Sequence, residues 1–183
     1  PVQCSLAGMP ITSGISTMDY FLSSDKLDSY DDQGLFSEEL FLLKTNCEYP
    51  SFPKLNDNFK TKKELGLPED KKIYMVPLQL HKFHPDFDSV VNEILKKDED
   101  GVIILFKSKE YIAEALKKRL KNNVDESVFE RIIFVPSASK EDFQSYIKAA
   151  DCLLDSFYYG AGSTCYIAFA LGVPIATMKK GYL

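Results

Sequence analysis

From residue 72 onward, short apolar runs alternate with longer segments in which apolar residues recur every three or four positions. The short runs predict buried strands, and the periodic segments predict helices with one face in a core. Expected strands cover residues 72–78, 101–106, 131–135, 152–154 and 173–177, and expected helices cover 85–95, 109–122, 140–150 and a segment beginning at 163 or 164. This order predicts an α/β domain whose parallel sheet is covered by helices on both faces.

The first third of the chain has a less regular pattern. It contains three short strand candidates, of which 2–6 is expected to be buried, and the others are 20–22 and 40–43. Residues 25–34 carry four aspartates and predict a surface loop, whereas 47–58 contains two prolines and predicts a linker. We therefore expect residues 1–58 to be the end of one domain plus a linker, and 59–183 to form a Rossmann-like domain. Thr61 and Glu64 match a capping box and predict a short helix that ends at Gly66.

The loop after the apolar run 152–154 is rich in small residues, Tyr159-Gly160-Ala161-Gly162, and a helix is expected to follow it. Ser163 or Thr164 is expected to cap that helix, and Gly172 to end it in a left-handed conformation. Free backbone N–H groups and the positive end of a helix suit an anion such as a phosphate. A tight turn without any ligand explains the same glycines, because such turns are common in α/β folds.

Three loops should meet at the carboxyl ends of the parallel strands, where ligands bind in such sheets. They cover residues 77–85, 136–140 and 155–164. Lys82, in the first loop, is the predicted cation for a phosphate held by the glycine loop, and Lys140 could meet a ribose or a base. Asp155 could accept hydrogen bonds from the glycine loop or contact a ligand, and the structural role is the preferred interpretation.

An acidic pair, Asp86-Phe87-Asp88, matches the D-x-D pattern that holds a divalent metal in one glycosyltransferase fold. Acidic residues are expected at this position for another reason, because they begin a predicted helix. The structural interpretation is the preferred one. The sequence contains no G-x-x-x-x-G-K-S/T and no G-x-G-x-x-G after the first strand, which argues against a P-loop nucleotidase and a dinucleotide dehydrogenase.

Composition narrows the function classes further. Hydrophobic residues make up 45% of the chain, charged residues 27%, and the net charge is −5, which does not favour nucleic acid. The basic residues of 117–121 are expected on a solvated helix face. No apolar run approaches the ~20 residues that cross a membrane. Cys4, Cys47, Cys152 and Cys165 show no C-x-x-C spacing, which predicts free thiols, no zinc site and a reducing, cytoplasmic setting.

Three blocks of the chain resemble glycosyltransferase family 41, which contains the protein O-GlcNAc transferases and the bacterial adhesin N-glucosyltransferases. PVQCSLAGMPITSGISTMDYFLSS, at residues 1–24, is similar to a family segment with a G-x-P-x-T-S/T-G loop followed by M-D-Y. Residues 64–87, ELGLPEDKKIYMVPLQLHKFHPDF, match the L-G-L-P entry and the Q-L-x-K loop. Residues 132–177 are similar to the block with A-D, L-D and G-x-P. The order and spacing of these motifs make the resemblance specific.

This resemblance implies a GT-B glycosyltransferase fold, in which two Rossmann-like domains face each other and the second binds a UDP-sugar. It implies a metal-independent, inverting transfer of GlcNAc or a hexose to a protein side chain, with no cofactor. Lys82 would be the catalytic residue and contact the diphosphate, with Gln79 beside it. The other expected contacts are Ala138, Lys140 and Phe143 at the uridine, and Gly162, Ser163 and Thr164 at the phosphates. Pro10, Thr12, Ser13 and Gly14 would line the cleft near the sugar and the acceptor.

The chain departs from the family pattern at four positions. It has Gly162 where many relatives have a histidine, Ile167 where an aspartate often holds the ribose, and Phe143 and Tyr146 in the helix that contacts uridine. We interpret the chain as a fragment that is inactive alone and that works with an upstream domain. Two other functions stay open, a UDP-sugar epimerase and a non-catalytic interaction module.

Overall fold

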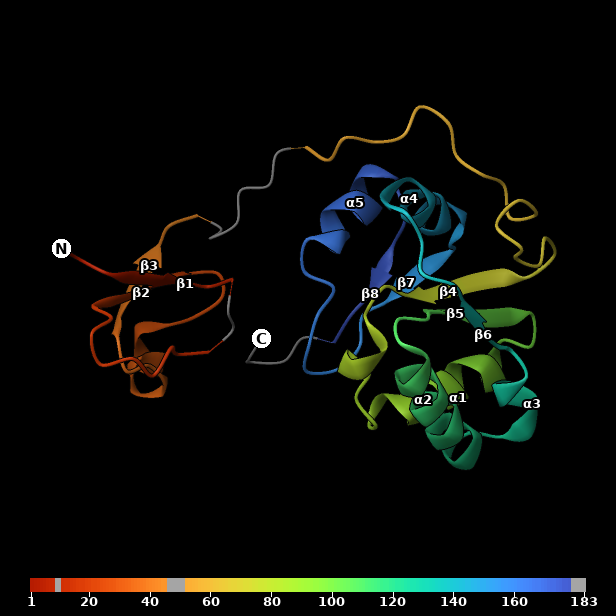
Figure 1. Cartoon of the computed structure of the whole chain (residues 1–183), viewed down its shortest axis with the longest axis horizontal. Coiled ribbons are helices and arrows are strands. Elements are labelled where there is room, and N and C mark those ends of the chain that lie inside the picture. The colour runs from red at the N-terminus through yellow and green to blue at the C-terminus, as the bar shows by residue number, and fades with distance from the viewer. Residues whose placement is uncertain (9–10, 46–51, 179–183) are drawn as a thin grey trace. The chain divides into compact units, whose positions relative to one another are not determined.

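The computed structural model describes residues 1–8, 11–45 and 52–178. These residues fall into two compact units, one that includes the described residues up to 45 and one that begins at Phe52 (Figure 1). Within the described residues, no helix combines the length and the apolar character needed to cross a membrane.

The first unit contains a three-stranded parallel sheet in the order β1-β2-β3. Its strands are β1 (Cys4–Leu6), β2 (Tyr20–Ser24) and β3 (Glu39–Leu43). Phe21 and Leu40 supply its buried core. The expectation of a buried first strand is wrong, because β1 lies at the end of the sheet order and Leu6 is 50% exposed.

A short 3-10 helix, η1 (Tyr30–Leu35), lies where a surface loop was expected. Two aspartates of that segment help to form it. The Ser29 hydroxyl accepts from the Asp31 N–H at 3.1 Å, and the Asp32 carboxylate accepts from the Ser29 N–H at 2.8 Å. This reciprocal capping satisfies N–H groups at the start of the helix, so part of the acidic stretch is ordered by its own side chains.

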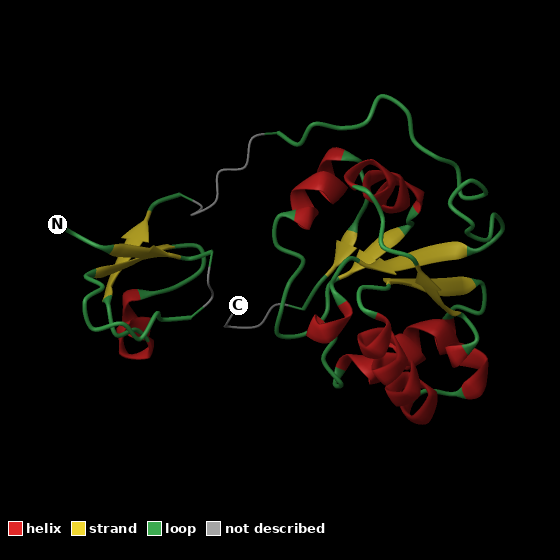
Figure 2. Cartoon of the chain, viewed as in Figure 1, coloured by secondary structure: helices red, strands yellow, loops and turns green. Residues whose placement is uncertain are grey.

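The second unit is built on a five-stranded parallel sheet in the order β6-β5-β4-β7-β8. The strands are β4 (Lys72–Val76), β5 (Gly101–Phe106), β6 (Ile132–Val135), β7 (Cys152–Leu154) and β8 (Ile175–Ala176). The helices are α1 (Phe87–Lys97), α2 (Glu110–Asn123), α3 (Glu126–Phe129), α4 (Lys140–Ala149) and α5 (Thr164–Ala170), with a 3-10 turn η2 (Leu80–Lys82). Sequence reasoning did not predict α3 or η2. The predicted parallel α/β architecture is confirmed (Figure 2).

Helices cover both faces of this sheet, with α1, α2 and α3 on one side and α4 and α5 on the other (Figure 1). Strand residues alternate between the two cores, as the pleat of a strand requires. In β4, Val76 packs into the core under α1 and α2, whereas Ile73 and Met75 pack into the core under α4 and α5. Burial on both faces explains why these strands appear in the sequence as continuous apolar runs.

The capping motifs at Ser139 and Thr61 both form as the sequence predicts, but only the one at Ser139 is followed by a helix. Ser139 caps α4 as predicted, because its hydroxyl accepts from the Asp142 N–H at 3.0 Å. Thr61 and Glu64 also form their predicted capping box, with the Thr61 N–H donating to Glu64 Oε2 at 2.8 Å. The segment that follows is a turn and not a helix. Gly66, the last residue of this turn, has a φ of +69°, a conformation that ends a helix before it gains a second turn.

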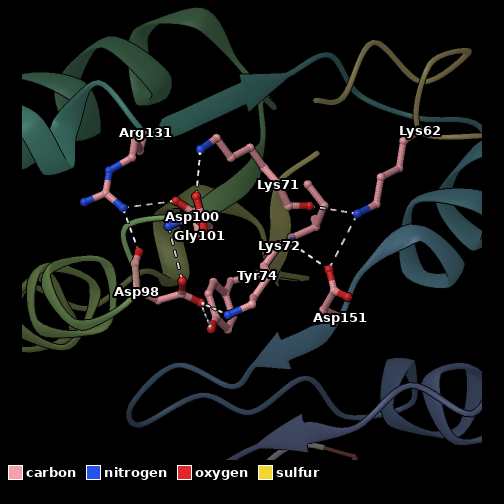
Figure 3. A network of polar contacts seen from close by, with 10 residues as sticks. Lys62, Lys71, Lys72, Tyr74, Asp98, Asp100, Gly101, Arg131 and Asp151 are labelled. Carbon is pink, nitrogen blue, oxygen red and sulfur yellow. Dashed lines mark hydrogen bonds and ion pairs between the residues drawn. The ribbon is translucent and has the colours of Figure 1, made fainter. Parts of the chain in front are cut away.

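A polar network joins the strands at their amino ends (Figure 3). Asp98 is its centre, since its Oδ2 accepts from the Tyr74 hydroxyl at 2.8 Å and from Lys72 Nζ at 3.1 Å. Arg131 donates to the backbone carbonyls of Leu95, Asp98 and Gly101. These groups satisfy one another at the sheet edge opposite the carboxyl ends, so they stabilise the fold and lie away from the expected ligand site.

The strand order places a topological switch point in the middle of the sheet, between β4 and β7. From β4 the chain moves outward through β5 to β6, then crosses to β7 on the other side of β4 and continues to β8. The direction of winding therefore reverses between β4 and β7. Ligands of open α/β sheets bind at such a switch point, outside the carboxyl ends of the two strands.

Candidate functional site

The loop after β4 holds Lys82 in a fixed backbone conformation. Its η2 turn is closed by the Lys82 N–H, which donates to the Gln79 carbonyl at 2.9 Å. Leu80, the first residue of this turn, and Phe83, which follows it, are each 3% exposed. The apolar side chains therefore anchor the loop while Gln79 is exposed and Lys82 only half-buried.

The Lys82 ammonium lies against the glycine loop that follows β7. Its Nζ is 3.6 Å from the centre of the Tyr159 ring, within the range of a cation–π contact. Residues 77 positions apart are thus brought together because β4 and β7 are neighbours in the sheet. The expected meeting of these two loops is confirmed, whereas the roles assigned to Gln79 and Lys82 stay predictions.

Asp155 organises the glycine loop from inside, as expected. Its carboxylate accepts from the Ala161 N–H at 2.7 Å and from the Thr177 hydroxyl at 2.9 Å. Gly162 follows at φ +53°, a left-handed conformation that disfavours any residue with a Cβ. The loop is therefore a shaped turn, tied through Asp155 to the residue that follows β8.

The start of α5 differs from the prediction. Ser163 occupies the N-cap position, yet its hydroxyl makes no capping hydrogen bond. The Thr164 N–H donates to the Ala161 carbonyl at 3.1 Å, so it is already used within the loop. In the described part of the chain, the N–H groups of Gly162 and Ser163 donate to no protein acceptor. These two N–H groups are therefore candidate donors for a phosphate, with the hydroxyls of Ser163 and Thr164 beside them.

The third predicted loop follows β6 and begins α4. Its Ala138 and Phe143 are half-buried and Lys140 is exposed. In the sheet order β6 lies two positions from β4, which places this loop about 10 Å away from Lys82's strand. A ligand that reaches from the glycine loop after β7 to this loop would therefore have to be elongated and to cross both β4 and β5.

Phe143 and Tyr146 are both used in packing. The Phe106 ring centre at the end of β5 lies 5.3 Å from that of Phe143 and 5.1 Å from that of Tyr146. Tyr146 is also buried, with its hydroxyl donating to the Leu65 carbonyl at 3.2 Å. These contacts give both departures from the family pattern a structural role.

Both carboxylates of the Asp86-Phe87-Asp88 motif have protein partners, and the motif begins α1, as the structural interpretation predicted. Asp88 is 2% exposed and accepts from Arg119 Nε and Nη2, both at 3.0 Å. Asp86 accepts from the Tyr158 hydroxyl at 2.7 Å. The expectation that Arg119 belongs to a solvated face is therefore wrong. Its guanidinium also donates to the Phe83 carbonyl at 2.9 Å, so it secures the loop that carries Lys82.

In the first unit, the predicted cleft loop is held by a buried carboxylate that the sequence did not indicate. Glu38 is 1% exposed, and it accepts from the Ser13 N–H at 2.8 Å and from the Thr12 hydroxyl at 2.5 Å. Burial alone would raise the pKa of Glu38, but the hydrogen bonds from Ser13 and Thr12 outweigh it and lower that pKa to about 2. Gly14 lies at φ +65°. Pro10 lies outside the described residues.

The fold and the loop geometry define a class of protein. A Rossmann-like parallel sheet of this kind occurs in GT-B glycosyltransferases, and the O-GlcNAc transferase of Thermobaculum terrenum, solved as a mutant, matches 97% of this chain with a TM-score of 0.76. The match covers 33% of that chain at 19% identity, so it establishes the fold. A sucrose-phosphate synthase from Thermosynechococcus elongatus matches 87% of this chain and 40% of its own, with 15% identity and a TM-score of 0.54.

The sequence comparison identifies the family. The sequence model of glycosyl transferase family 41 matches residues 53–183 of this chain, so the chain belongs to this family. An Arabidopsis thaliana protein named "Probable UDP-N-acetylglucosamine--peptide N-acetylglucosaminyltransferase SEC" is 27% identical over 185 residues, which cover 97% of this chain. The chain spans 19% of the length of that relative.

Proposed function

We propose that this chain is the donor-binding part of a UDP-sugar-dependent glycosyltransferase that transfers GlcNAc or a hexose to a protein side chain. The observation that carries the proposal is the position of the Lys82 ammonium, which lies on the glycine loop at the switch point between β4 and β7. Membership of glycosyl transferase family 41 supports the reaction class. The name of the Arabidopsis relative supports a UDP-sugar donor and a peptide acceptor.

The chemistry requires stabilisation of a leaving group. An acceptor oxygen or nitrogen attacks the anomeric carbon, and the bond from that carbon to the diphosphate breaks. The electron pair leaves with UDP, while a base accepts the proton that the acceptor loses. The Lys82 ammonium and the N–H groups of Gly162 and Ser163 would stabilise the charge on UDP, without a metal ion. Attack opposite the leaving group inverts the anomeric configuration.

The cysteines bear on the cellular location of the protein. Cys4, Cys152 and Cys165 are free thiols, and burial raises the pKa of the last two, which keeps them unreactive. Free thiols support a reducing, cytoplasmic location. We propose that a further domain of a longer protein completes the acceptor side, because this chain spans 19% of its Arabidopsis relative.

Calorimetry with UDP tests the donor site in this chain. We expect Lys82→Ala to weaken UDP binding by about 10–100-fold, the equivalent of one charge-assisted hydrogen bond. Lys118→Ala is the matched control, because that exposed lysine lies on α2 and should bind UDP like the wild type. The wild-type chain should bind UDP with the same affinity in the presence of EDTA and in the presence of magnesium. Stronger binding of ADP or GDP than of UDP would contradict the proposed donor.

In an intact enzyme that contains this chain, Lys82→Ala should lower kcat by about 100–1000-fold, as expected for loss of a group that stabilises developing charge. Circular dichroism should show an unchanged fold, because the ammonium lies at the surface of the loop. Turnover within a factor of two of the wild type would show that Lys82 is not catalytic.

A second candidate function is a non-catalytic interaction module. The packing of Phe143 on Phe106 and the buried hydroxyl of Tyr146 favour it, because both side chains serve the core. A chain that binds no nucleotide at millimolar concentration would support this alternative. We do not retain the epimerase alternative, since both carboxylates of the Asp86-Phe87-Asp88 motif are engaged by protein partners.

A further inference from the structure

Two adjacent tyrosines join the glycine loop to the loop that carries Lys82. Tyr158 has a φ of +68°, the one positive value at a non-glycine residue in the described chain. A left-handed conformation at a tyrosine is unfavourable and persists when neighbouring contacts hold it. Such contacts exist here, because the Tyr158 hydroxyl donates to Asp86 at 2.7 Å and its ring meets His84 edge-on, with centres 4.4 Å apart.

The next residue, Tyr159, makes a different contact in the same loop. Tyr159 is 44% exposed, and the Lys82 ammonium lies 3.6 Å from the centre of its ring. The turn at Tyr158 therefore directs one tyrosine to Asp86 and the next to Lys82. Both contacts link segments more than 70 residues apart, so they fix the spacing between the two loops at the switch point.

The backbone of Lys82 is fixed independently of this contact. The η2 turn and the bond from Arg119 to the Phe83 carbonyl hold it from the other side. The flexible part is the four-carbon stem of Lys82, and the Tyr159 ring restricts where its ammonium can lie. A ring face contacts one side of an ammonium, which leaves other N–H donors directed away from the ring for an anion.

We propose that Tyr159 is a positioning residue for Lys82, which holds the ammonium beside the glycine loop so that it meets a nucleoside diphosphate with little loss of side-chain freedom. This inference rests on the proposed donor site, and the Tyr158–Asp86 bond maintains the turn that presents the ring. Preorganisation of this kind strengthens binding by reducing the entropy lost on association. A cation–π contact of ordinary strength corresponds to about 3–10-fold in affinity.

The contact itself can be measured without any ligand. Reductive methylation with ¹³C-formaldehyde labels each lysine and keeps its charge, and Lys82→Arg identifies the signal of Lys82. We expect that signal to be shifted upfield by the ring current of Tyr159. The shift should persist in Tyr159→Phe, which keeps the ring, and vanish in Tyr159→Leu. A Lys82 signal at the position of the exposed lysines in the wild type would overturn the proposal.

The effect on binding is tested by a double-mutant cycle with UDP. We expect Tyr159→Leu to weaken UDP binding by about 3–10-fold when Lys82 is present and to have no effect when Lys82 is replaced by alanine. Tyr159→Phe should bind like the wild type. Tyr111→Leu, which removes another exposed tyrosine from α2, is the control for general loss of an aromatic ring.

The possible failures have different meanings. A wild-type chain that does not bind UDP would overturn both the donor site and this inference. UDP binding that depends on Lys82, but that Tyr159→Leu leaves unchanged or strengthens, would overturn the positioning role alone. An equal loss with and without Lys82 would also overturn it, because it would show that the tyrosine acts by general support of the loop.

Discussion

Replacement of Arg119 by leucine should destabilise the second unit strongly, because it leaves a buried carboxylate without its main partner. Arg119 donates to both oxygens of Asp88 at 3.0 Å, and Asp88 is 2% exposed. After the change, Asn123 Nδ2, at 2.9 Å, is the remaining side-chain donor to Asp88 in the described chain.

The size of the effect follows from the burial of the pair. Removal of one partner from a buried ion pair costs about 3–5 kcal/mol. The Arg119 side chain is 29% exposed, so we expect about 3 kcal/mol, at the lower end of that range. With a urea dependence of about 1–3 kcal/mol per molar, the unfolding midpoint should fall by about 1–3 M.

Two further variants separate this explanation from a general loss of packing. Asp88→Leu should cost less than Arg119→Leu, because the arginine it leaves behind is partly in water. The double variant should cost less than the sum of the single changes, since no buried charge remains. Lys117→Ala breaks the exposed ion pair with Glu114 on the same helix and should leave the midpoint unchanged.

Urea unfolding followed by circular dichroism measures these differences. The reasoning is wrong if Arg119→Leu shifts the midpoint no more than Lys117→Ala does, or if the double variant shows the full sum of the two single effects. Arg119→Leu should also weaken UDP binding, but less than Lys82→Ala does, because Arg119 secures the Phe83 carbonyl beside Lys82.

Three other positions give separate predictions. Glu38 has a pKa of about 2 against an ordinary value of 4.5, so its stabilising effect is complete above pH about 4.5 and is lost as the pH falls toward 2. The protection of the Ser13 amide, which is its hydrogen-exchange rate relative to the intrinsic rate at the same pH, should fall over that range, and Glu38→Gln should abolish this dependence. Gly101→Ala should cost about 1–3 kcal/mol in urea unfolding, because a Cβ there would lie 2.8 Å from Cε2 of Tyr74. Gly162→Ala should cost only about 1 kcal/mol, since its φ is +53° but no atom lies within 4 Å of the added Cβ; a loss as large as that of Gly101→Ala would contradict this.

Periodicity predicted the second unit well for a physical reason. Strands buried on both faces leave continuous apolar runs, and β5 has the bounds that the sequence indicated, at Gly101–Phe106. Gly172, expected to end α5 in a left-handed conformation, has a φ of +73°. Prediction was poorer where local signals compete, as at Thr61, whose capping box forms without a helix because Gly66 follows too soon.

The contacts that complete the site were not predictable from local pattern. Arg119 lies among lysines on α2, and its neighbours suggested a solvated face, whereas its partner Asp88 is 31 residues away. Tyr159 gives no signal of its own, because its partner Lys82 becomes a neighbour only when β7 pairs with β4. The sequence can predict which loops lie at the carboxyl ends of the strands. Which side chains of those loops contact each other depends on the tertiary structure.

The register between β4 and β7 connects the fold to the proposed chemistry. Tyr74 pairs with Cys152 and Met75 with Leu153, so the two strands end at the same level, at Val76 and Leu154. The two loops therefore begin side by side. A slip of one residue would move one loop along the strand by about 3.3 Å, which is nearly the whole distance from Lys82 to the Tyr159 ring.

Asp151 helps to set this register from the amino ends of β4 and β7. Its Oδ2 accepts from the Ile73 N–H at 2.8 Å, and Lys62 Nζ lies 3.7 Å from the same oxygen (Figure 3). The Asp151 N–H in turn donates to the Ile73 carbonyl at 2.9 Å. A one-residue slip would break both hydrogen bonds and move every side chain of β7 to the other face. The polar network at the amino ends of the strands thus acts on the site at their carboxyl ends, because it fixes where Lys82 and the glycine loop begin.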